Sequence, residues 1–72
     1  MSLTNSARLG YNGSQLPEDA SPIARQAYSF GRYLHDTGRT IPTDVRTRSG
    51  GQMLSGDLCF EWSVDRGWQR IH

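Results

Sequence analysis

The most constraining feature of this sequence is a run near its C-terminal end in which large apolar and polar side chains alternate. The apolar positions of the run are Leu58, Phe60, Trp62 and Val64. Successive side chains of a β-strand point to opposite faces, so this spacing predicts a strand with one strongly apolar face and one polar face. An apolar face of this size has to be covered, and we expect a helix to pack against it.

The residues after this run predict a hairpin that continues to the end of the sequence. Asp65-Arg66-Gly67 fits a three-residue loop with glycine in the left-handed position. The expected cross-strand pairs are Val64 with Trp68, Trp62 with Arg70, and Phe60 with His72. The second of these pairs would allow a guanidinium group to stack on an indole ring.

A helix is predicted between residues 22 and 37. Ser21 and Pro22 suit the N-cap and the first helical position, and Gly38 suits the left-handed residue that follows the last turn. Four apolar residues lie within about 60° of one another on this helix, at 100° per residue. These residues, which we expect to form the buried face, are Ile23, Ala27, Phe30 and Leu34. Gly31 lies at the edge of this face, where we expect it to let the helix approach the sheet closely.

The rest of the sequence indicates shorter strands and an irregular start. Turn residues punctuate the chain after the helix and indicate strands at 43–48 and 52–54. Near the N-terminal end, Asn12-Gly13 predicts the tight turn of a hairpin. We therefore expect residues 1–20 to form a flexible or loosely docked arm. Residues 21–72 are expected to form one α+β domain, with a single helix packed on an antiparallel meander of three or four strands.

Charge and cysteine content limit the setting in which the chain works. All eight positive charges are arginine and seven residues are acidic, so the net charge of +1 gives no general attraction to nucleic acid. Cys59 is the only cysteine, which excludes a disulfide within the chain and favours a reducing, cytoplasmic compartment. The sequence contains neither an apolar run of about 18 residues nor a signal-peptide pattern, so we expect no membrane association.

Residue types that carry catalysis or hold metal ions are too sparse to form a site. His35, Cys59 and His72 are each separated by more than ten residues, which does not match the close ligand spacing of a zinc site. On a strand, Cys59 is most simply a small apolar filler. The glycines do not form a phosphate-binding motif. We expect a protein without enzymatic activity, metal or cofactor.

Binding is the remaining class of function, and arginine and aromatic side chains are the types most enriched at binding hot spots. The helical projection places two arginines opposite the buried face and two tyrosines on its flanks. The candidate partner-binding residues are Arg25, Tyr28, Arg32 and Tyr33 on the helix, and Arg66, Trp68 and Arg70 on the C-terminal hairpin.

These features favour a small interaction protein that binds and occludes a surface of a larger protein or protein complex. Short, catalytically empty chains are typical of inhibitors that phages and mobile elements direct at host machinery such as defence systems, although this link is an association. The alternative is a small regulator that binds nucleic acid through Arg39, Arg46 and Arg48. Binding through phosphate contacts would weaken steeply as the salt concentration rises, which separates the two hypotheses.

Overall fold

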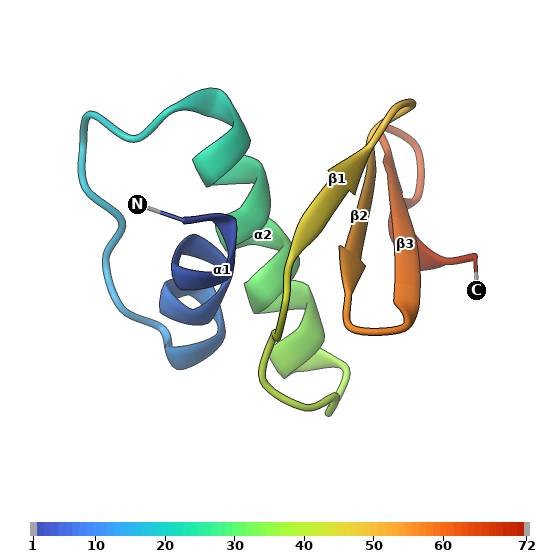
Figure 1. The fold of residues 1–72 in the computed structure, drawn as a ribbon, viewed down its shortest axis with the longest axis horizontal. Helices are drawn as coiled ribbons and strands as arrows, with labels where there is room; N and C mark the ends of the chain where they lie inside the picture. Colours follow the sequence, from blue (N-terminus) through green and yellow to red (C-terminus); the bar gives the residue numbers. More distant parts are fainter. Residues whose placement is uncertain (1, 72) are drawn as a thin grey trace.

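The chain folds into two layers, a pair of helices and a four-stranded sheet (Figure 1). The computed structural model describes residues 2–71. Its elements are α1 (Leu3–Asn12), α2 (Pro22–Asp36), β1 (Arg46–Arg48), β2 (Gln52–Ser55), β3 (Leu58–Ser63) and β4 (Gly67–Arg70). The strands form an antiparallel meander in the order β1-β2-β3-β4, which confirms the α+β prediction, but with two helices in place of one. Neither helix is long and apolar enough to cross a membrane, as far as the described residues go.

Helix α2 forms where the sequence predicts it, because both of its ends are capped. The Ser21 hydroxyl accepts a hydrogen bond from the Ala24 N–H at 3.2 Å, and Pro22 occupies the first turn. At the other end Thr37 is the C-cap, and Gly38 has the expected left-handed φ of 73°.

The predicted N-terminal hairpin is wrong, because Leu3–Asn12 forms helix α1. The Ser2 hydroxyl caps this helix by accepting a hydrogen bond from the Asn5 N–H at 3.1 Å. Gly13 has a φ of 74° and donates its N–H to the last turn, so Asn12-Gly13 ends a helix and does not join two strands. Both structures need a left-handed glycine at this point, which is why the dipeptide alone misled the prediction.

Helices α1 and α2 cross with their backbones in direct contact. A Cβ atom on Gly10 would lie 2.1 Å from the carbonyl oxygen of Tyr28, and one on Gly31 would lie 1.8 Å from that of Ala7. Gly31 therefore allows close approach to α1, and the expectation that it faces the sheet is wrong. Small residues on both helices make this crossing possible, because any side chain would push the two backbones apart.

Helix α1 also holds the segment that leads from α2 into the sheet. Three hydrogen bonds join them: from Arg8 Nε to the carbonyl oxygen of Pro42 (2.9 Å), from the Tyr11 hydroxyl to that of Arg39 (2.6 Å), and from the Val45 N–H to Thr4 Oγ1 (2.9 Å). The start of β1 is thus positioned by α1, a helix distant from it in sequence.

The core lies between α2 and the inner face of the sheet, and Phe30 is at its centre. The ring centroid of Phe30 lies 5.3 Å from that of Phe60 and 5.0 Å from that of Trp68. The Trp68 indole N–H also donates a hydrogen bond to the Ser29 hydroxyl at 3.1 Å. The buried cluster comprises Ala7, Ala27, Phe30, Leu34, Val45, Met53, Phe60 and Trp68.

The hairpin of β3 and β4 differs by two residues from the predicted register. Gly67 has a left-handed φ of 69° as expected, but it pairs with Ser63 and begins β4 where the prediction put it at the end of the loop. Trp62 consequently faces Trp68, and Phe60 faces Arg70. The predicted pairing of Phe60 with His72 falls partly outside the described residues. A shift of two leaves every side chain on its predicted face.

Three residues expected in the core are exposed instead. Ile23 is 47% exposed, Trp62 is 43% exposed and Val64 is 85% exposed. Ile23 lies two helical turns before Phe30, the residue whose ring contacts the sheet. Trp62 lies two residues after Phe60 on β3, opposite Trp68, which is the tryptophan that packs on Phe30. Val64 lies in the loop between β3 and β4. The alternating pattern predicted correctly which side chains share a face of β3. It could not show how far along the strand that face is covered by the helix.

We predict that Gly31→Ala destabilises the protein by roughly 1–3 kcal/mol or more, because the added methyl group has no space beside Ala7. Ser6→Ala is the matched control in the same helix pair, since it removes the Oγ atom of a buried side chain where Gly31→Ala adds a methyl group. Its buried hydroxyl has no hydrogen-bond partner among the described residues, so this variant should be neutral or more stable. Urea unfolding of both variants measures the difference, and equal midpoints would show that the helices are not in backbone contact.

We further predict that Phe60→Ala costs about 3–5 kcal/mol in stability while Trp62→Ala costs only about 1 kcal/mol. The reason is that Phe60 is completely buried, whereas nearly half of the Trp62 side chain is already in water. Thermal melts followed by circular dichroism compare the two variants. A Trp62→Ala loss as large as that of Phe60→Ala would mean that the core extends to the end of β3.

Candidate functional site

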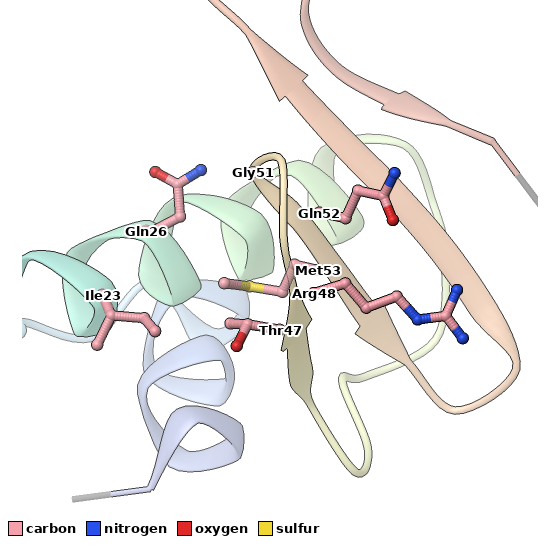
Figure 2. A pocket seen from close by; sticks show the side chains of 7 residues that line it. All are labelled: Ile23, Gln26, Thr47, Arg48, Gly51, Gln52 and Met53. Carbon is pink, nitrogen blue, oxygen red and sulfur yellow. The ribbon is translucent and has the colours of Figure 1, made fainter.

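A cavity of about 300 Å³ opens between the N-terminal half of α2 and the hairpin of β1 and β2 (Figure 2). Its helical wall comes from the turns of α2 that precede Phe30, the residue whose ring contacts the sheet. The residues that line it are Ile23, Gln26, Thr47, Arg48, Gly51, Gln52 and Met53.

The hairpin and the helix each supply one wall of this cavity. Thr47 faces Met53 across the β1–β2 ladder, so their side chains project from the same face of the sheet. Figure 2 shows both pointing toward the helix, which carries Ile23 and Gln26. The turn between the strands contains Gly50 and Gly51 with left-handed φ values, which lets the hairpin close tightly beside the opening.

The lining of the cavity is mostly apolar. Met53 is buried at its floor, while Ile23 remains half exposed at its mouth. The side chains of Arg48 and Gln52 leave the hairpin on the side away from the helix (Figure 2). The volume of the cavity is at the lower end of the range of ligand pockets. The cavity is suited to an aliphatic or aromatic side chain that enters from outside.

The sequence-predicted helix residues separate into two pairs. Arg25 and Arg32 are exposed, as predicted. Tyr28 donates its hydroxyl proton to the carbonyl oxygen of Ser14 at 2.6 Å, which ties the connection between the helices to α2. Tyr33 is half-buried and packs edge-on against Phe60 at 5.5 Å between centroids. Both tyrosines thus hold the fold together, and the two arginines are not joined by an aromatic surface.

The predicted hairpin residues are also divided between core and surface. Trp68 is buried against Phe30, so its indole is not presented to a partner. Arg66 lies exposed in the loop between β3 and β4. Arg70 is exposed and faces Phe60 across the ladder, where the prediction placed it opposite Trp62.

The three arginines of the nucleic-acid alternative do not form one patch. The Arg39 guanidinium lies over the Phe60 ring at 5.3 Å, on the inner face of the sheet. Arg46 and Arg48 project from the other face, because they alternate with Thr47 along β1. The Arg46 guanidinium is also held by the Asp44 carboxylate and the carbonyl oxygen of Gly56.

Of the groups considered for catalysis and metal binding, Cys59 is enclosed, His35 lies at the opposite end of α2 from the cavity, and His72 lies outside the described residues. Cys59 is 2% exposed, and its Sγ lies 3.8 Å from Gln52 Oε1. His35 contacts Asp36 and packs edge-on against the Tyr11 ring. Residues 2–71 include no cluster of three histidine, cysteine or acidic side chains that could hold a metal ion.

Sequence reasoning missed the cavity because it assigned the lining residues to other roles. Ile23 fits the helical apolar spacing and was placed in the core. Thr47 and Met53 belong to short strands whose pairing the sequence did not specify. The sequence signal that could have indicated an open end is the position of Ile23 in the first turn of the helix, one residue after Pro22.

Comparison with protein-family models, curated proteins and solved structures found no match to this chain. Its function has to be inferred from the geometry of the site.

Proposed function

We propose that the protein works by binding a larger protein partner and occluding part of its surface, and that the cavity between α2 and the β1–β2 hairpin is the centre of the contact. The observation that carries this proposal is the pairing of an apolar cavity with exposed apolar side chains at the same end of the molecule. Ile23 lines the cavity, and the backbone N–H of Trp62 donates to the carbonyl oxygen of Gly51, another lining residue, at 3.4 Å.

Burial of these side chains supplies a driving force for association. Ile23 and Trp62 are each roughly half exposed. A partner that covers them removes apolar surface from water, which contributes about 25 cal/mol for each Å² buried. Tryptophan is among the residue types most enriched at interface hot spots.

The distribution of arginines supports a protein partner over nucleic acid. Non-specific binding to nucleic acid requires a continuous row of positive charges that follows the phosphates. Arg39 lies on the inner face of the sheet over an aromatic ring, and Arg46 is partly neutralised by Asp44. A protein surface needs only a few charges at the rim of an apolar centre.

We predict that Ile23→Glu abolishes capture of the partner without unfolding the protein, because it places a charge at the mouth of an apolar cavity. Arg32→Glu is the matched control, since it introduces the same residue at an exposed position of the same helix. Tagged wild-type protein and both variants are used for affinity capture from cells that express the gene naturally, after circular dichroism has confirmed their folding.

We expect the wild type and Arg32→Glu to enrich the same partner protein, and Ile23→Glu to capture none of it. Equal capture by all three proteins would contradict the location of the site. Enrichment of nucleic acid that disappears steeply as salt rises, without a protein, would support the alternative function.

A further inference from the structure

Strand β1 is an exposed edge of the sheet beside the cavity. It is first in the strand order, and all three of its residues are exposed. An edge strand carries backbone N–H and C=O groups without a ladder partner, and these can pair with an added strand.

The register shows which backbone groups point outward. The backbone N–H of Trp62 donates to the carbonyl oxygen of Gly51. The backbone groups of the odd-numbered residues of β2 therefore bond to β3, and those of the even-numbered residues bond to β1. Their partners on β1 are Arg46 and Arg48, which leaves the N–H and C=O of Thr47 directed away from the sheet. The Val45 N–H, two residues before Thr47, also points away from the sheet and donates to Thr4 Oγ1 of α1.

The cavity and the outward backbone groups of Thr47 lie at the same point along β1. A residue paired with Thr47 on an added strand would project its side chain from the same face as the Thr47 side chain. That face carries the cavity, whose walls include Thr47, Met53 and Ile23. The added residue at this position would therefore enter an apolar space.

The opposite face of β1 is basic. Arg46 and Arg48 project there, next to the positions that flank the residue paired with Thr47. The Arg48 guanidinium has no hydrogen-bond or ion-pair partner within residues 2–71, and the Arg46 side chain is still about half exposed despite its contact with Asp44. Carboxylates are the complementary groups for these two positions.

We propose that β1 accepts an extended segment of the protein partner as an additional strand, in which an apolar residue is flanked on both sides by acidic residues. The apolar side chain enters the cavity opposite Thr47, and the carboxylates lie beside Arg46 and Arg48. This inference rests on the proposed function and names the part of the partner that is recognised.

The other edge strand, β4, does not offer the same arrangement. The Ile71 N–H donates to the carbonyl oxygen of Cys59, so the odd-numbered residues of β4 face β3 and the backbone of Trp68 points outward. The inner face at that position is filled by the buried Trp68 side chain itself. An added strand there would find no space for an apolar side chain.

The test uses the labelled peptide acetyl-Thr-Thr-Glu-Leu-Glu-Thr-Thr-amide and fluorescence anisotropy. We predict saturable binding to the wild type and at least about tenfold weaker binding to Thr47→Pro, which lacks the outward N–H but leaves the bonds to β2 intact. Thr47→Val keeps the N–H and changes only the side chain, so the loss of affinity with Thr47→Pro should clearly exceed any change with Thr47→Val. No binding to the wild type, or equal binding by Thr47→Pro, would overturn the inference.

A charge exchange provides a second arm that does not depend on proline. Arg48→Glu should weaken binding of the glutamate peptide and favour the peptide in which lysine replaces both glutamates. Arg32→Glu has the same charge change on α2 and should leave both affinities unchanged. Loss of binding with Arg32→Glu as large as with Arg48→Glu would show that net charge alone attracts the peptide.

The two proposals can fail separately. If Ile23→Glu loses the natural partner while Thr47→Pro captures it like the wild type, the cavity binds the partner without strand addition, and only the inference is overturned. If wild-type protein captures no partner but binds the peptide in the predicted manner, the edge is competent for strand addition and the proposed function fails.

Discussion

The direct backbone contact between α1 and α2 is the constraint on which the rest of the structure depends. Gly31 against Ala7, and Gly10 against Tyr28, leave no room for side chains between the two helices. This contact holds α1 beside α2, where α1 also bonds to the segment before β1, including the Val45 N–H. The helix crossing therefore sets where the first strand begins, although neither helix contributes a residue to that strand.

The position of the candidate site follows from where the core ends. Phe30 contacts Phe60 and Trp68, and these rings keep α2 and the sheet together in the middle of the molecule. Two turns earlier along α2, Ile23 faces the β1–β2 hairpin across a cavity. A thin core of a small domain cannot cover both layers along their full length. The uncovered end is the surface at which a partner can complete the burial.

The sequence predicts those elements whose signals are local. Helix α2 has a cap at each end, and β3 has an alternating pattern, so both are recognisable without knowledge of their neighbours. Helix α1 was missed because Asn12-Gly13 satisfies the needs of a hairpin turn and of a helix end equally well. The exposure of Ile23 and Trp62 was missed because periodicity identifies a face but not the length over which that face is covered. The outward backbone of Thr47 depends on the pairing register of β1 with β2 and of β2 with β3, which involves residues outside β1.

Amide hydrogen exchange of the protein bound to its captured partner is the most direct test of a partner strand added to β1. The account predicts that exchange of the Thr47 amide slows strongly on binding, because its N–H gains a backbone acceptor. Exchange of the Trp68 amide, which points outward from the opposite edge of the sheet, should not change. Unchanged exchange at Thr47 in the complex, or slowing at Trp68 in its place, would contradict the assignment of β1 as the binding edge.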